Sequence, residues 1–236
     1  MLNSKVGYSK NTDAYEAGKE TATKATEGIS AKIGLLFNSV GYDQKKLMEG
    51  IKSVAKDVDV IGCTSSAGII TPDGYMIDED GTAGMLTLGG DDLTVACYGM
   101  AKGKSARETG REVAKKALEK AGLDYAPDYF FMSASPAEEE EYIKGIQDVI
   151  GRVPCFGGSA ADNTVEGKWS IFYNDTIFND GVVAAFFYTA NDIATVYTGA
   201  YNETKDMGII TKLNDTRVLA EIDGEPALDK YKNWRG

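Results

Sequence analysis

Two short stretches decide the fold: Ile61-Gly62-Cys63-Thr64-Ser65-Ser66-Ala67-Gly68 and, 95 residues later, Phe156-Gly157-Gly158-Ser159-Ala160-Ala161-Asp162-Asn163. Each begins at the end of a short apolar run and passes through glycine into small hydroxyl and methyl side chains. Nothing large shields the backbone N–H groups of such a segment, so it can form a pocket for a small polar or anionic group. The alternative is a tight turn whose glycines serve only the backbone.

The same spacing relates positions outside the two stretches. An offset of 95 residues pairs Gly50 with Gly145 and sets Leu35-Leu36-Phe37 opposite Phe130-Phe131-Met132. This period is too long for a solenoid repeat and suits a duplicated half-domain. We therefore expect an α/β fold built from two αβαβββ-like halves. They should form one pseudo-symmetric body, with mixed β-sheets, helices on the outer faces and the two glycine turns close together.

The expected domain organisation follows from this duplication. The first half should cover residues 1–102 and the second half residues 103–203. The exit segment, 204–236, should form strands and a helix that lead to an absent C-terminal domain. Gly89-Gly90-Asp91-Asp92 predicts a hairpin within the first half, and a further strand is expected at Ile193–Thr198.

Composition excludes several classes of partner. The net charge of −11 argues against nucleic acid and anionic membranes, which both reward basic patches. The longest apolar stretch, Val182–Tyr188, is too short to span a bilayer, and the N-terminus has no signal-peptide core. The three cysteines show no disulfide spacing, which suits a reducing compartment. These observations favour a cytoplasmic protein.

Histidine is absent from the chain. Ser-His-Asp and Cys-His catalysis within this chain are therefore excluded, as are zinc sites that use imidazole. The cysteine spacing lacks any CxxC pair, so no metal or other cofactor is expected. The absence of histidine favours a binding protein over an enzyme.

The candidate ligand-binding side chains lie in the two stretches and after one neighbouring strand. Hydroxyl groups of the first stretch suit a carboxylate, while Asp162 and Asn163 could hold an ammonium group or could instead form an Asx-turn. Cys63 could be a nucleophile, but no basic residue near it in sequence lowers its pKa, which favours a buried structural role. The expected ligand-binding residues are Asn38, Cys63, Thr64, Ser65, Ser66, Gly157, Gly158, Ser159, Asp162 and Asn163.

Four motifs in order resemble one known family. They are Gly7-Tyr8-Ser9 with Asp13 and Ala17-Gly18, the two small-residue stretches, and the exit Asp223-Gly224-Glu225-Pro226-Ala227-Leu228. Over about residues 6–232 the chain resembles the FIST N-terminal domain (F-box and intracellular signal transduction). The resemblance implies a cytoplasmic sensory module that binds small ligands such as amino acids. Its signalling partner would be an output domain of the chemotaxis-transducer, histidine-kinase or cyclic-dinucleotide-enzyme type.

One departure from the family and two competing functions remain. Family members usually continue into a FIST C-terminal domain, and if that domain completes the pocket, this chain alone would bind weakly. We expect a sensory domain that binds a small polar ligand, with an amino acid as a candidate. The alternatives are an enzyme that acts on a small anionic metabolite through Cys63 or Asp162, and a protein-interaction scaffold with an empty pocket.

Overall fold

The structure is a computed structural model that describes residues 2–77, 81–215 and 217–235. The chain divides into two compact units, Met1–Ile193 and Ala194–Gly236. We call them the main unit and the C-terminal unit and describe each by itself. The expected exit segment, 204–236, lies inside the C-terminal unit, whose boundary falls earlier in the chain.

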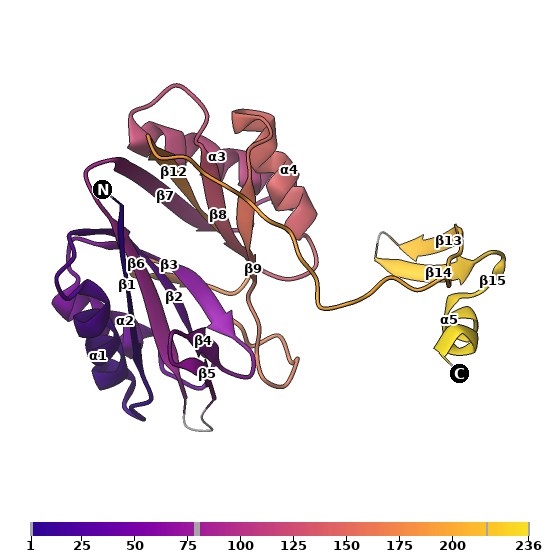
Figure 1. The fold of residues 1–236 in the computed structure, drawn as a ribbon, viewed down its shortest axis with the longest axis horizontal. Helices are drawn as coiled ribbons and strands as arrows, with labels where there is room; N and C mark the ends of the chain where they lie inside the picture. The colour runs from indigo at the N-terminus through magenta and orange to yellow at the C-terminus, as the bar shows by residue number, and fades with distance from the viewer. Residues whose placement is uncertain (1, 78–80, 216, 236) are drawn as a thin grey trace. The chain divides into compact units, whose positions relative to one another are not determined.

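The main unit runs through two similar series of strands and helices (Figure 1). The first series is β1 (Asn3–Ser9), α1 (Ala14–Thr26), β2 (Ala31–Ser39), α2 (Gln44–Val54), β3 (Asp59–Ser65), β4 (Ile69–Thr71), β5 (Gly74–Met76) and β6 (Ala83–Gly89). The second series is β7 (Leu93–Ala101), α3 (Ala106–Ala121), β8 (Tyr129–Ala134), α4 (Glu139–Ile150), β9 (Cys155–Ser159), β10 (Ile171–Tyr173), β11 (Thr176–Phe178) and β12 (Gly181–Thr189).

The strands form two mixed sheets and one separate hairpin. The first sheet has the order β1-β6-β2-β3-β10-β11, and the second has the order β7-β12-β8-β9. In each sheet one pair of strands is parallel among the described residues, and it joins the strands on either side of a helix, β2 with β3 and β8 with β9. The order β1-β6-β2-β3 thus recurs as β7-β12-β8-β9. The β10–β11 hairpin crosses to the first sheet, and β4 pairs only with β5 among the described strands.

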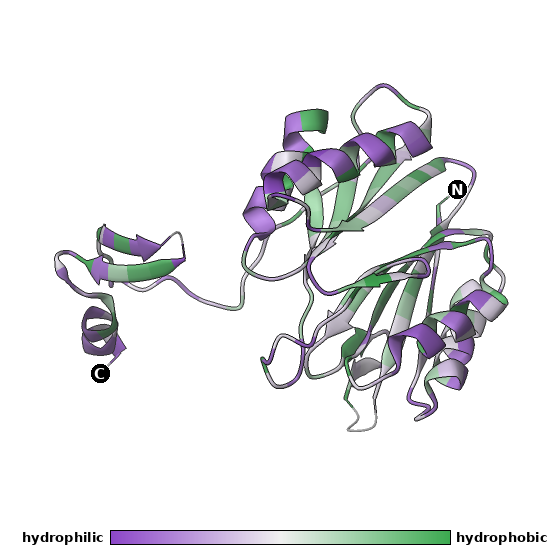
Figure 2. Ribbon diagram, turned by 180° about the vertical axis from the view of Figure 1, so that it is seen from behind, coloured by the Kyte–Doolittle hydropathy of each residue, from purple (hydrophilic) through white to green (hydrophobic). Residues whose placement is uncertain are grey.

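The main unit has four layers, with the two sheets face to face and the helices outside, as the sequence predicts (Figure 1). α1 and α2 pack on the outer face of the first sheet, and α3 and α4 pack on that of the second. Figure 2 shows hydrophobic residues on the strands between the helix layers and hydrophilic residues on the helices. Phe37 and Phe131 meet edge-to-face between the sheets, with ring centroids 6.2 Å apart. Full burial of one such side chain stabilises the fold by about 1.5–3 kcal/mol.

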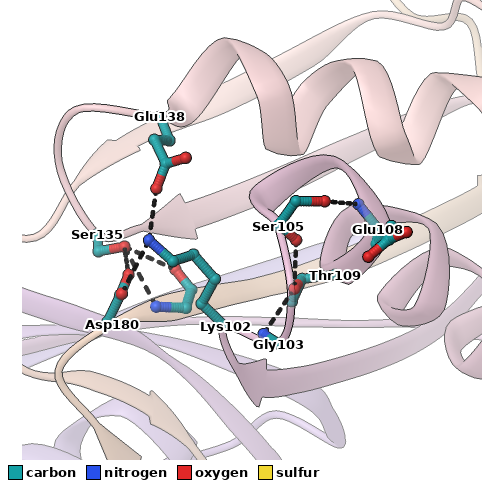
Figure 3. Close-up of polar contacts among 9 residues, drawn as sticks. Lys102, Gly103, Ser105, Glu108, Thr109, Ser135, Glu138 and Asp180 are labelled. Atoms are coloured by element: carbon teal, nitrogen blue, oxygen red, sulfur yellow. Dashed lines mark hydrogen bonds and ion pairs between the residues drawn. The ribbon is translucent and has the colours of Figure 1, made fainter.

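Two helices begin at residues whose side chains cap them. The Asp13 carboxylate accepts a hydrogen bond of 2.9 Å from Glu16 N at the start of α1. The Ser105 hydroxyl accepts one of 3.2 Å from Glu108 N at the start of α3 (Figure 3). Each bond satisfies a backbone N–H that has no partner within its helix.

The C-terminal unit is a small sheet followed by a helix. Its elements are β13 (Ile210–Asp215), β14 (Val218–Ile222), β15 (Glu225–Pro226) and α5 (Ala227–Arg235), and its strand order is β13-β14-β15. The Asp223 carboxylate accepts a hydrogen bond of 2.8 Å from Ile209 N and lies 3.4 Å from Lys230 Nζ. These contacts hold the turn after β14 against α5.

The structure corrects three expectations from the sequence. β6 and β7 do not form the predicted hairpin, because the turn at Gly90–Asp92 carries the chain from the first sheet to the second. No strand forms at Ile193–Thr198. Finally, the register pairs Leu36 with Gly62 and Met132 with Gly157, so the β2 and β8 residues correspond at an offset one residue larger than 95.

Candidate functional site

Gly62 and Gly157 lie inside strands β3 and β9, and the backbone requires glycine at both positions. Gly62 has φ +150° and Gly157 has φ +146°, a region that L side chains rarely adopt. A Cβ at either position would lie 1.8 Å from a carbonyl oxygen of the neighbouring parallel strand, at Leu36 or Met132. Neither glycine lies in the expected tight turn, and the close approach of the neighbouring parallel strand explains both glycines without a ligand.

The two small-residue stretches lie against each other, as the sequence predicts. Ala161 N donates a hydrogen bond of 2.9 Å to Thr64 O, and Ala67 N donates one of 2.9 Å to Asn163 Oδ1. The buried Thr64 hydroxyl donates to Ala161 O at 2.8 Å and accepts from Ser170 N at 2.9 Å. Thr64 and Asn163 thus join the two halves, and the Thr64 hydroxyl and Asn163 Oδ1 already have partners inside the protein.

The Asp162 carboxylate holds the loop that follows it in the chain. Its carboxylate accepts backbone hydrogen bonds from Thr164 N (3.1 Å), Glu166 N (3.1 Å) and Lys168 N (2.7 Å). The residue is 4% exposed, and these donors, the Lys168 amide first, hold the pKa of the carboxyl below its ordinary value. This arrangement is the turn that the sequence offered as the alternative to an ammonium site.

Asp162→Asn is expected to loosen the loop that follows. Because the charged carboxylate accepts these bonds more strongly than an amide does, hydrogen exchange of the Thr164, Glu166 and Lys168 amides should become about tenfold faster. The folded-state pKa is lowered, so the contribution is complete above the unfolded value of ~3.9 and is lost as the pH falls through the folded value. Exchange measured by NMR at neutral pH checks the prediction, and unchanged rates in the variant would contradict it.

Cys63 lies in the core between the two sheets. The residue is 3% exposed, and burial raises the pKa of its thiol to about 11, although the Ser133 hydroxyl beside it acts in the opposite direction. Since the thiolate is the nucleophilic form, this environment makes Cys63 unreactive at neutral pH. The observation removes one of the two residues on which the enzyme alternative rests.

Alkylation should separate the cysteines by burial. Iodoacetamide at pH 8 is expected to modify the exposed Cys155 and to leave the buried Cys63 and Cys97 unmodified until the protein is denatured. Mass spectrometry of tryptic peptides gives the site of each adduct. Modification of Cys63 in the folded protein at a rate similar to that of Cys155 would contradict the assignment.

The remaining predicted residues fall into two groups. Asn38 is 0% exposed, and its Nδ2 donates to Ser39 O at 2.9 Å and to Gln44 Oε1 at 2.7 Å. Gly157, Gly158 and Ser159 lie on β9, an exposed strand at the end of the second sheet, where the Ser159 hydroxyl donates to the Glu139 carboxylate. None of these residues lines the cavity described next.

A cavity of about 660 Å³ lies beside the end of β3. Its wall combines the β4–β5 hairpin with strands of the first sheet and includes two of the predicted residues, Ser65 and Ser66. The Ser65 hydroxyl donates to Gly68 O at 2.8 Å, while Ser66 is exposed. The lining residues are Val6, Phe37, Ser65, Ser66, Ala67, Gly68, Ile69, Ile70, Thr71, Pro72, Tyr75, Gly84, Met85 and Leu86. The wall is predominantly apolar, with a few hydroxyl groups at one side, which is typical of small-molecule sites.

Sequence reasoning missed the apolar part of this wall. Ile70 is 87% exposed and Tyr75 is 61% exposed, both on a short hairpin over the sheet. The signal in the sequence was the run Ile69-Ile70 directly after the small-residue stretch, followed by Tyr75 across a Pro-Asp turn. Such apolar residues within a turn-rich segment indicate a hairpin that packs against another part of the protein.

A second polar cluster lies at the ends of β7 and β8 (Figure 3). The Ser135 hydroxyl donates to Asp180 Oδ1 at 2.7 Å, and the side chain at the N-cap of α4, Glu138, makes no capping hydrogen bond. Lys102 Nζ lies 2.6 Å from Glu138 Oε2 and 3.1 Å from Asp180 Oδ2. Glu138, and then Asp180, raise the pKa of Lys102, which therefore stays protonated and cannot act as a general base. The cluster joins the ends of three elements and offers no activated nucleophile.

The described residues contain neither a metal-binding cluster nor a helix that could span a membrane. Within residues 2–77, 81–215 and 217–235, no group of three or more Cys, Asp or Glu side chains is arranged to hold a metal ion. Over the same residues, no helix combines the length and the apolar character needed to cross a bilayer.

Comparison with known proteins gives a family match and several similarities in structure. No curated protein matches the chain. Cyanuric acid hydrolase from A. caulinodans is similar in structure at 10% identity and a TM-score of 0.43, over 80% of this chain and 68% of that chain. A ketosynthase domain from Streptomyces albus is similar at 13% identity and a TM-score of 0.30, over 75% and 78%. Residues 32–225 match the FIST N domain family. The chain therefore belongs to the FIST N domain family.

Proposed function

We propose that this chain senses a small molecule, which it binds in the cavity between the β4–β5 hairpin and the first sheet. FIST domains are sensory modules of signalling proteins. The observation that carries the proposal is the cavity itself, since about 660 Å³ lies within the range of small-molecule sites. The first small-residue stretch leads directly into its wall through Ser65 and Ser66.

The chemistry of the wall narrows the class of ligand. Val6, Phe37 and Leu86 present apolar surface, whereas the Ser66 hydroxyl lies on the exposed side of the cavity. A ligand with an apolar body and one polar end satisfies both parts, because a charged group against the apolar part would lose its hydration without a partner. An amino acid with a branched or aromatic side chain has this form. The proposed setting is cytoplasmic, with a chemotaxis-transducer, histidine-kinase or cyclic-dinucleotide output domain as the partner.

The alternative functions receive less support. The enzyme alternative requires Cys63 or Asp162 as a reactive group, yet the thiol is buried and the carboxylate faces backbone amides of its own loop. The structures at 10% and 13% identity carry no argument for an activity. The scaffold alternative leaves the cavity empty and is tested by the same experiment as the sensor.

A thermal-shift screen tests the proposal. Amino acids and small organic acids are added to the purified chain at millimolar concentration, and the melting temperature is measured. A ligand at 100 times its Kd stabilises the folded state by about 2.7 kcal/mol, which raises Tm by roughly 5–10 °C in a protein of this size. We expect leucine-like or phenylalanine-like ligands to raise Tm more than glycine. Equal shifts for all amino acids, or no shift for any ligand, would contradict the proposed cavity.

A further inference from the structure

No described strand pairs with the outer edge of β9, although the corresponding edge of β3 is covered. β3 and β9 occupy the same place in their sheets, each parallel to the preceding strand and each with its glycine opposite Leu36 or Met132. β10 pairs antiparallel with β3 and places Phe172 opposite Gly62. β9 ends its sheet with every residue exposed. An edge strand of this kind presents unpaired backbone N–H and C=O groups.

The β4–β5 hairpin of the first series corresponds in position to the β10–β11 hairpin of the second. β10–β11 lies between β9 and β12, and β4–β5 lies between β3 and β6. Each hairpin has three-residue strands and a two-residue turn, Asn174-Asp175 in one and Pro72-Asp73 in the other. One edge of β4 pairs with β5, and no other described strand forms a ladder with β4. β4, with three residues, and β9, with five, are therefore two open edges among the described strands.

The side chains of β4 fit the positions that β10 fills. In β10, Phe172 is 1% exposed and packs in the core under α1 and α2. The corresponding residue of β4 is Ile70, which is 87% exposed. Phe156 of β9, next to Gly157, is 48% exposed. Pairing of β4 with β9 would cover both side chains, and burial of apolar surface stabilises such a contact.

The connection to β4 starts beside the end of β9. Ala161 follows β9 closely and hydrogen-bonds Thr64 near the end of β3, from which β4 follows after three residues. Ala161 N donates to Thr64 O and Thr64 N donates to Ser170 O, at 2.9 Å each. The loop between β9 and β10 therefore begins and ends beside Thr64. The path from β9 to β10 is therefore short in space. The first series lacks an equivalent of that loop, and Ser65 and Ile69 are separated only by Ser66, Ala67 and Gly68.

The β4–β5 hairpin is held in place by exposed polar contacts and by Ile69 and Thr71 of β4, which are buried. The Tyr8 hydroxyl donates to the Asp73 carboxylate, and this contact is exposed. The Tyr75 hydroxyl donates to Ala67 O within the same segment. Exposed polar contacts contribute little to stability, so they oppose a movement of the hairpin only weakly.

We propose that the β4–β5 hairpin has a second docking position, in which β4 pairs antiparallel with β9. The register follows from β10 on β3: Ile69 opposite Gly158, Ile70 opposite Gly157 and Thr71 opposite Phe156. Because the same hairpin forms a wall of the cavity, docking changes the cavity and gives the domain two states. This last consequence rests on the proposed function, whereas the docking itself does not.

Disulfide trapping tests the register. The variant Ile69→Cys/Gly158→Cys is made in a Cys155→Ser background and oxidised with oxidised glutathione, which takes up the two electrons. A Cβ at Gly158 meets no atom within 4 Å, so that position accepts a side chain. The matched control is Tyr75→Cys/Gly158→Cys, because Tyr75 lies on the far strand of the hairpin. We expect intramolecular cross-linking at least tenfold faster in the variant than in the control, measured by intact mass and peptide mapping.

A second pair keeps the test decisive if the first variant folds poorly. Thr71→Cys/Phe156→Cys, in the same background, tests the neighbouring register position and should also cross-link faster than the control. The melting temperature of each reduced variant shows whether it folds. The proposal is overturned if neither pair cross-links faster than the control, or if the fast product is a disulfide-linked dimer, which would place the strand of a second copy on β9. No ligand is present, so failure here leaves the thermal-shift result for the cavity unaffected.

Discussion

Gly157→Ala is expected to destabilise the main unit by about 3–5 kcal/mol and to lower its melting temperature by roughly 10 °C. The new Cβ would lie 1.8 Å from Met132 O, a backbone atom that cannot move without breaking the β8–β9 ladder. The φ of +146° adds strain for any residue with a side chain. Gly62→Ala should behave in the same way, since its Cβ would meet Leu36 O at the same distance.

Gly158→Ala is the matched control for this prediction. Gly158 is the next residue on β9, and a Cβ there meets nothing within 4 Å. Its φ does not lie in the left-handed region. We expect a change in stability within about 0.5 kcal/mol, which is typical of a surface substitution. Thermal unfolding followed by circular dichroism compares the two variants. Equal melting temperatures for Gly157→Ala and Gly158→Ala would contradict the backbone role of Gly157.

The sequence was sufficient to predict much of the fold, because local signals and burial agree there. Asp13 and Ser105 lie at helix starts and cap them. Apolar spacing places Leu47 and Ile51 on the buried face of α2. These features depend on residues near one another in the chain, which a single sequence displays directly.

The exchange of strands between sheets was not predictable in this way. Gly89-Gly90-Asp91-Asp92 has the composition of a hairpin turn, but β6 pairs with β1 and β2, whereas β7 pairs with β12. Partners so distant in the chain leave no local pattern. A turn motif shows that the chain reverses there and does not show which strand becomes the neighbour.

The candidate site was predicted in part. Small hydroxyl side chains indicated a pocket, and Ser65 and Ser66 do line the cavity. Thr64 is also a small hydroxyl residue, but its hydroxyl donates to Ala161 O and accepts from Ser170 N inside the protein. Sequence cannot separate these cases, because a hydroxyl that caps the backbone and one that faces a cavity have the same neighbours in the chain.

Ser66→Trp is expected to weaken ligand binding at least tenfold, which corresponds to a loss of about 1.4 kcal/mol. Ser66 lines the cavity and is exposed, and no side-chain hydrogen bond of Ser66 is recorded among the described residues. An indole at this position would occupy space that the ligand needs, while the fold loses no internal contact. The matched control is Ser53→Trp, which places the same side chain on an exposed position of α2, on the outer face of the first sheet.

Titration calorimetry tests the central claim most directly. The amino acid that gives the largest thermal shift is titrated into the wild-type chain, Ser66→Trp and Ser53→Trp, after equal melting temperatures show that both variants fold. The cavity assignment predicts one site per chain in the wild type, unchanged affinity in Ser53→Trp and at least a tenfold higher Kd in Ser66→Trp. An equal Kd for all three proteins would place the ligand elsewhere and contradict the assignment of the cavity.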